Sequence, residues 1–189
     1  MVSACDQSAG AGGVSALGKG GSPAGILGFD LGGDGAGEGF LSIPAGGSRL
    51  PASHATVEAR QHYVKMNGRE VFKFATRVVE QSAGRVLGRC GRTVADVDLF
   101  VPHQANMRII DTAARKLGIA PEKVYTSLQR YGNTSCASIP LCLSGARAEG
   151  RLHEGDLLLM MGFGAGLSWG ACLMEWGRTG GRKETKDEG

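Results

Sequence analysis

The sequence has 189 residues, of which 42% are hydrophobic, so it can form one sizeable core or a single domain with appendages. A net charge of +3, an aromatic content of 6% and the lack of any run of five or six basic residues argue against a nucleic-acid-binding module. No apolar run approaches the ~18 residues that span a bilayer, and the five cysteines form neither CxxC pairs nor a disulfide framework.

Residues 1–24 are rich in Ser, Ala and Gly, have no usable periodicity and lack the features of a secretory signal. We expect them to be a diverged or disordered segment, followed by one domain over residues 25–177. The charged, Gly-rich residues 178–189 are expected to be a disordered tail. The sequence does not decide between a bacterial cytoplasm and a plastid stroma.

Ile26 to Leu31 is predicted to be a strand, the following Gly-Gly-Asp-Gly stretch a turn, and Phe40 to Ile43 a returning strand. A phosphate-binding loop is the alternative, but neither GxxxxGK[ST] nor a GxGxxG before a helix is present. Residues 44–65 are typical of a surface connection, in which His54 and His62 are expected to be solvent-exposed loop residues.

A long amphipathic helix is predicted from Asn67, with Glu70 three residues later as a reciprocal cap and Gly88 and Gly91 ending it. A strand from Val97 to Val101 then stops at Pro102 and presents His103 just beyond its end. A helix that Gly118 terminates follows, and the run 124–128 is predicted to be a second strand leading to Asn133.

The remaining elements are a helix with Pro140 in its first turn, an apolar strand from Leu157 to Met161 and a last strand from Ser168 to Trp176. The 157–161 strand is apolar throughout, which predicts a central position in a sheet covered on both sides. This order of strands and helices predicts a layered α/β domain. His103 and Asn133 would both follow strands, at the sheet edge where open α/β sheets bind ligands.

Three motifs, PHQAN at 102–106, RYGNTS at 130–135 and GFGAGLSWG at 162–170, resemble the closing half of beta-ketoacyl-acyl carrier protein synthase III. This condensing enzyme initiates type II fatty acid synthesis. The similarity extends upstream through GILGFDLGGDG, IPAGGSR and MNGREVFKFATRVVE, over about residues 25–177. It implies a thiolase-like layered α/β/α fold, C-terminal half only, and an acyltransferase of lipid metabolism.

The resemblance also implies a Cys-His-Asn triad, whose histidine and asparagine His103 and Asn133 match by motif. Without these motifs, a strand-end histidine bonded to backbone and a helix-capping asparagine would be the simpler interpretation. The family's nucleophilic cysteine belongs to the first half of its chain, and Cys5, just 20 residues before Gly25, is a poor match for it. We therefore expect a fragment that is inactive alone. Cys136 is expected to be a buried, inert thiol.

Other site residues follow from the same resemblance. Backbone N–H groups around Gly164 and Ala165 would form a second oxyanion site for the acyl-cysteine carbonyl, and Phe163 would border the acyl pocket. The segment that receives the acidic carrier protein corresponds to Gln104, Ala105, Asn106, Met107 and Arg108, with Arg108 as its cation. A lone solvated arginine is the alternative for Arg108.

The expected reaction condenses acyl-CoA with phosphopantetheine-linked malonyl-acyl carrier protein by decarboxylative Claisen chemistry, with no bound cofactor or metal. The expected partners are acyl carrier protein and a CoA thioester, and either a second copy, as a homodimer in the full-length family, or a separate N-terminal half. Neither nucleic acid nor a membrane is expected. The alternatives are a non-catalytic carrier-protein-binding module, half of a split enzyme and a residual malonyl decarboxylase.

Overall fold

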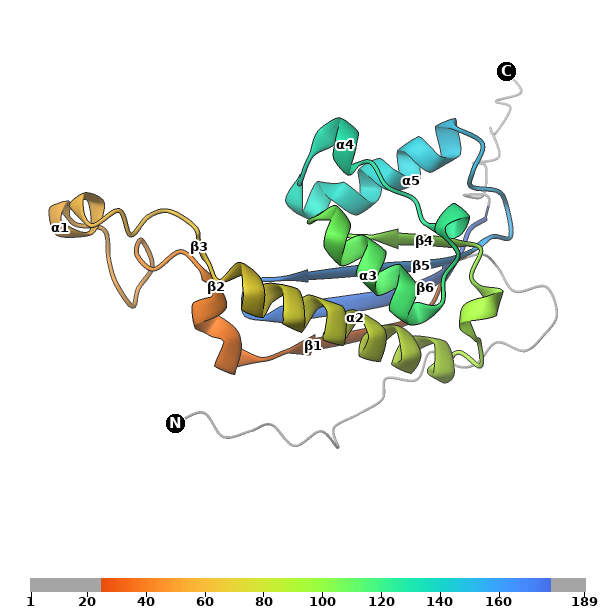
Figure 1. The fold of residues 1–189 in the computed structure, drawn as a ribbon, viewed down its shortest axis with the longest axis horizontal. Coiled ribbons are helices and arrows are strands. Elements are labelled where there is room, and N and C mark those ends of the chain that lie inside the picture. The colour runs from red at the N-terminus through yellow and green to blue at the C-terminus, as the bar shows by residue number, and fades with distance from the viewer. Residues whose placement is uncertain (1–24, 178–189) are drawn as a thin grey trace, which may run out of the picture.

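A four-stranded sheet organises the protein, and the computed structural model describes residues 25–177 of it (Figure 1). The predicted N-terminal segment and C-terminal tail lie outside these residues. The strands are β1 (Gly25–Gly33), β4 (Leu99–Pro102), β5 (Leu157–Gly164) and β6 (Ser168–Glu175), in the order β1-β6-β5-β4. Only the β4–β5 pair is parallel. The layered α/β domain predicted from the sequence is confirmed.

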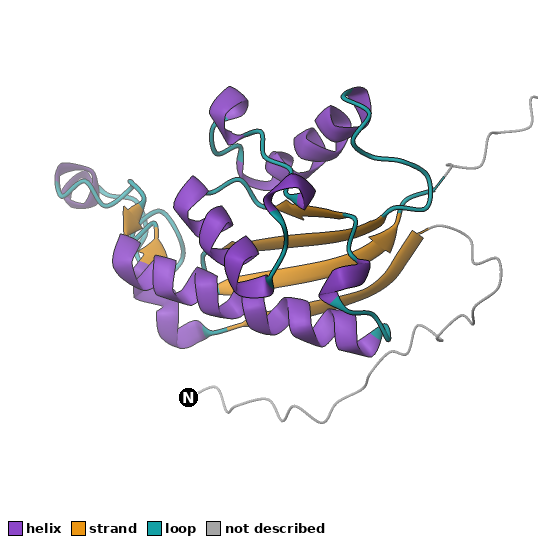
Figure 2. Cartoon of the chain, turned by 45° about the vertical axis from the view of Figure 1, so that its right-hand side comes forward, coloured by secondary structure: helices purple, strands orange, loops and turns teal. Residues whose placement is uncertain are grey.

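Helices cover both faces of this sheet (Figure 2). On one face lie α2 (Gly68–Arg89) and α3 (Met107–Leu117), and on the other lies α5 (Ser138–Ala148). The side chains of β5 alternate between the two cores, since Leu159 and Met161 pack with α2 and α3 while Leu158 packs with α5. The 157–161 run is therefore a central strand buried on both faces, as its composition predicts.

The capping residues predicted for the two helices on the first face hold in the structure. The Asn67 side chain accepts a hydrogen bond from the Glu70 N–H over 3.3 Å, and Gly118 ends α3 in the left-handed region with φ 72°. The reciprocal cap from Glu70 does not form. The backbone N–H of Asn67 donates to the Phe40 carbonyl instead, while the Glu70 carboxylate pairs with Lys73.

An arm formed by residues 43–66 projects from the body of the domain (Figure 1). After β1 the chain forms a 3-10 helix, η1 (Gly35–Phe40), and then β2 (Leu41–Ser42), which pairs with β3 (Lys65–Met66) at the other end of the arm. The predicted 40–43 strand is therefore shorter and does not return along β1. The arm also contains the short helix α1 (His54–Glu58).

A buried carboxylate joins β1 to α2. Asp30 is 4% exposed and accepts hydrogen bonds from Ser82 over 2.6 Å and from Arg85 over 2.8 Å, and Arg89 lies 3.2 Å away. Burial by itself raises the pKa of Asp30, but these hydrogen bonds and positive charges outweigh it, so the pKa lies below its ordinary value. The charged form therefore stabilises the contact between the strand and the helix.

The second predicted strand, over residues 124–128, does not form. It is reduced to one parallel bridge between Phe100 and Val124, after which the chain enters the short helix α4 (Leu128–Tyr131). The backbone N–H groups of Ser127 and Leu128 donate to Oε1 of Gln104 over 2.9 and 3.1 Å, in place of a neighbouring strand. Short 3-10 helices complete the fold: η2 (Val94–Asp96), η3 (Pro121–Lys123) and η4 (Ser135–Ala137).

Candidate active site

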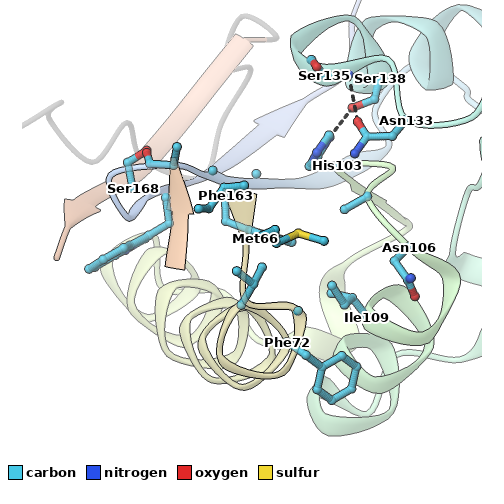
Figure 3. A pocket seen from close by; sticks show the side chains of 18 of the residues that line it. Met66, Phe72, His103, Asn106, Ile109, Asn133, Ser135, Ser138, Phe163 and Ser168 are labelled. Atoms are coloured by element: carbon cyan, nitrogen blue, oxygen red, sulfur yellow. Dashed lines mark hydrogen bonds between the residues drawn. The ribbon is translucent and has the colours of Figure 1, made fainter. Parts of the chain in front are cut away.

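A broad cavity of about 1410 Å³ opens at the carboxyl ends of β4 and β5 (Figure 3). Because these strands are parallel neighbours, the residues that follow them leave the sheet at the same edge. The cavity brings together His103, Asn133 and residues 163–165 at the end of β5, which the sequence had placed in one site. The first turns of α2 and α3 form another part of its wall.

His103 directly follows β4, and its backbone N–H donates to the Met161 carbonyl of β5 over 2.6 Å. Its Nδ1 lies 2.6 Å from the Ser138 hydroxyl, and its ring meets the Phe163 ring edge-on with centroids 5.9 Å apart. Burial among these groups lowers the pKa of His103 below its ordinary value. A neutral imidazole, able to donate from one nitrogen, is therefore the favoured form near pH 7.

Asn133 reaches the cavity from the turn after α4. It thus follows a short helix, whereas the sequence predicted that it follows a strand. Its Oδ1 accepts a hydrogen bond from the Ser135 N–H over 3.0 Å, which fixes the amide so that the NH₂ group is available to a ligand. In Figure 3 the side chains of Asn133 and His103 lie side by side on the same wall. The site therefore presents two neutral donor groups in one place.

The end of β5 contributes Phe163 and Gly164 to the lining, and the turn between β5 and β6 contributes Ala165. Its position is fixed by a reciprocal backbone pair, in which the Asp34 N–H donates to the Leu167 carbonyl over 2.7 Å and the Leu167 N–H donates to the Asp34 carbonyl over 2.8 Å. These two hydrogen bonds join the turn to Asp34 at the start of η1, and they fix the position of the backbone beside the cavity.

The predicted carrier-protein segment divides between the surface and the interior. Ala105, Asn106 and Arg108 line the cavity and Met107 is 38% exposed, whereas Gln104 is 0% exposed. The side-chain NH₂ group of Gln104 donates a hydrogen bond to the Pro102 carbonyl, and its Oε1 accepts hydrogen bonds from the two backbone N–H groups at the start of α4. Placing Gln104 on a docking surface is therefore a prediction that its burial contradicts. Its role is to join the end of β4 to α4.

Two basic residues that the sequence analysis did not single out line the same opening. Arg69 and Lys73 lie one turn apart in the first turns of α2, and Arg108 lies over the Phe72 ring at 5.7 Å on the α3 side. Their i,i+4 spacing is visible in the sequence, but many surface helices show the same pattern. Only the packing of α2 against α3 brings these cations together with Arg108.

Cys136 lines the cavity and is exposed, which corrects the expectation that it is buried. The other cysteines within residues 25–177 are Cys90, Cys142 and Cys172, and none of these lines the cavity. Within the same residues there is no group of three or more His, Cys, Asp or Glu side chains that could hold a metal ion. In this part of the chain, no helix has both the length and the apolar character needed to cross a bilayer.

The fold is shared by solved structures. The chain aligns with the crystal structure of beta-ketoacyl-acyl carrier protein synthase III from Thermus thermophilus at a TM-score of 0.74 and 45% identity, covering 85% of this chain and 49% of that one. The corresponding enzyme from Aquifex aeolicus aligns at a TM-score of 0.71 and 39% identity, covering 84% and 46%. The fold is therefore that of the thiolase-like synthases.

Residues 87–176 match the family of 3-oxoacyl-acyl carrier protein synthase III C-terminal domains. A beta-ketoacyl-acyl carrier protein synthase III from Symbiobacterium thermophilum is 58% identical over 154 residues, which are 82% of this chain and 47% of that protein. The match to the synthase III C-terminal family and the identity to this relative confirm the resemblance inferred from the three motifs. The chain spans about half the length of the curated relatives it matches.

Proposed function

We propose that this chain carries out the decarboxylation and carbon–carbon bond formation of a synthase III reaction, in which an acyl group from acyl-CoA is joined to malonyl-acyl carrier protein. The observation that carries this proposal is the pair of neutral donors, His103 and Asn133, on one wall of the cavity. The similar synthases from Symbiobacterium thermophilum and Natranaerobius thermophilus are named for acyl carrier protein, which supports this substrate class.

The chemistry asks for donors of this kind. When the bond to the malonyl carboxylate breaks and carbon dioxide leaves, the electron pair becomes an enolate with negative charge on the thioester oxygen. A neutral imidazole N–H and a carboxamide NH₂ can stabilise this charge by hydrogen bonding. Because both groups are neutral, they place no positive charge in the site before the reaction. Each such preorganised donor is typically worth about 3 kcal/mol of barrier.

The acyl partner would bind against the β5–β6 turn. We assign to the backbone N–H groups near Gly164 and Ala165 the second oxyanion site, which holds the acyl thioester carbonyl, and to Phe163 a wall of the acyl pocket. The fixed position of this turn supports the assignment, because a preorganised dipole needs no rearrangement during the reaction.

Acyl transfer also needs a cysteine nucleophile, and no cysteine within residues 25–177 lies in the family's Ala-Ala-Cys-Ser-Gly setting. We therefore assign to the described residues only the steps that use His103 and Asn133. The exposed apolar side chains Ile26, Phe29 and Leu31 on β1 support association with a further polypeptide, either a cysteine-bearing N-terminal half or a second copy. A second candidate function is carrier-protein binding without turnover, which the cations Arg69, Lys73 and Arg108 in the lining of the cavity support.

Carrier-protein docking is proposed at the mouth of the cavity, where Arg69, Lys73 and Arg108 gather. Carrier proteins are acidic, so these cations would steer their approach and salt would weaken it. Arg108→Glu is expected to raise the Kd for malonyl-carrier protein. Arg92→Glu, beyond the other end of α2, is the matched control that should leave the Kd unchanged.

The test of the proposal is carbon dioxide release from malonyl-carrier protein by the purified chain. The wild type is expected to release carbon dioxide without forming a 3-ketoacyl product, since acyl transfer needs the cysteine that the described residues do not supply. His103→Ala and Asn133→Ala are expected to abolish release while keeping carrier-protein binding. His153→Ala removes an exposed histidine on a turn and serves as the control that retains activity. Tight binding without any release by the wild type would instead support the non-catalytic module.

A further inference from the structure

Ser138 is a buried hydroxyl that contacts the site histidine. It is the first residue of α5, is 1% exposed and lies 2.6 Å from Nδ1 of His103 (Figure 3). Within residues 25–177, the contact with His103 is the one side-chain hydrogen bond of the Ser138 hydroxyl. The contact joins the end of β4 to the helix that packs on the opposite face of the sheet from α2.

The direction of this hydrogen bond decides which nitrogen of His103 carries the proton. A neutral imidazole has one N–H, and whichever nitrogen accepts from a neighbour leaves the other protonated. If Ser138 donates to Nδ1, the proton is on Nε2, the nitrogen that remains to meet a ligand in the cavity. If Nδ1 donates to Ser138, Nε2 becomes an acceptor and cannot stabilise an oxyanion.

Burial favours the first arrangement. In the reverse direction the serine proton would need another acceptor, and a hydroxyl that is 1% exposed has little access to water. Because burial also lowers the pKa of His103, the doubly protonated ring, which could not accept from Ser138, is disfavoured.

We propose that Ser138 is a positioning residue, which donates its hydroxyl proton to Nδ1 of His103 and thereby holds the imidazole in the Nε2–H tautomer. Its consequence for catalysis rests on the proposed function, since the Nε2–H group would be a donor to the enolate oxygen. The tautomer itself is a property of the resting protein and can be measured without substrate.

The experiment is ¹⁵N–¹H correlation through two bonds on protein with ¹⁵N-labelled histidine, which separates the two neutral tautomers. The chain has four histidines, so the His103 signals are assigned by their loss in His103→Gln. We expect Nε2–H in the wild type, a mixture of tautomers in Ser138→Ala and the wild-type pattern in Ser138→Thr, which keeps a hydroxyl. An Nδ1–H ring in the wild type, or an unchanged tautomer in Ser138→Ala, overturns the proposal.

The kinetic arm compares carbon dioxide release by the same variants. Ser138→Ala is expected to lower kcat about tenfold or more with little change in KM, because loss of tautomer control costs catalysis more than binding. Ser138→Thr is expected to restore kcat. If the wild type releases no carbon dioxide, the proposed function fails while the tautomer measurement still decides on Ser138. If Ser138→Ala does not fold, the wild-type spectrum and Ser138→Thr decide.

Discussion

The side-chain oxygen of Asn133 accepts the backbone N–H of Ser135, two residues later, over 3.0 Å. This short contact orients the amide, so that its NH₂ group and not its oxygen is the group available in the cavity. An aspartate at the same position could accept the same N–H but would bring a negative charge where a donor is needed.

Asn133→Asp is therefore expected to preserve the conformation of the turn but to lose decarboxylation activity. Carbon dioxide release from malonyl-carrier protein should fall about 10²- to 10³-fold, the usual loss for one oxyanion donor. Asn67→Asp is the matched control, because that residue caps α2 as an acceptor and an aspartate can do the same. Equal losses in the two variants would contradict the assignment.

The lowered pKa of His103 predicts how activity depends on pH. The neutral ring is the donor, so release of carbon dioxide should be constant from pH 8 to below about 6.5, the ordinary histidine pKa, and fall as the pH drops through the lowered value. The free energy of unfolding should change with pH in the same direction. Because the folded-state pKa of His103 is depressed, its contribution to stability is present above the unfolded pKa and is lost as the pH falls through the folded pKa. An NMR titration of the ring gives the midpoint, and a value above 6.5 would contradict the prediction.

Replacing Gln104 is expected to destabilise the fold although the residue touches no substrate. Gln104→Met keeps the volume but leaves the Ser127 and Leu128 N–H groups without their acceptor, at about 1–3 kcal/mol for each group that stays buried and unpaired. Urea unfolding measures the loss. Gln129→Met, an exposed position in α4, should unfold at the wild-type urea concentration.

The buried carboxylate of Asp30 predicts a stability difference that depends on pH. Asp30→Asn removes the charge that holds Arg85 and Ser82, and should lower the free energy of unfolding by about 1–3 kcal/mol at pH 7. Because the folded pKa is depressed, the wild type keeps this advantage above about pH 4 and loses it as the pH falls through the folded pKa. Glu38→Gln breaks an exposed pair with Arg49 and should change little.

Most of the sheet and the long helices could be predicted from the sequence, because local signals determine them. The stripe of apolar residues in α2, the Asn67 cap and Gly118 act within a few residues. The apolar β5 run also predicts its own central position. The two catalytic candidates were found by motif, and the structure places both in one cavity.

The errors arose where a distant side chain replaces a regular backbone partner. Residues 124–128 have a strand-like composition, but Gln104 takes two of their N–H groups and pairing with β4 ends at Val124. The burial of Gln104 and the gathering of Arg69 with Arg108 depend on long-range packing, which the local pattern does not encode. The contact between Ser138 and His103 likewise depends on the packing of α5 beside the end of β4.

The antiparallel return of β6 has a practical consequence for anyone wishing to immobilise the protein. Glu175 pairs with Leu157, the first residue of β5, whereas Ser168 pairs with Gly164 beside the cavity. The strand thus carries Trp176 to the end of the sheet remote from the opening. A sensor-chip linkage introduced there would leave the mouth facing outward, so a large acidic ligand could approach without steric hindrance from the solid support.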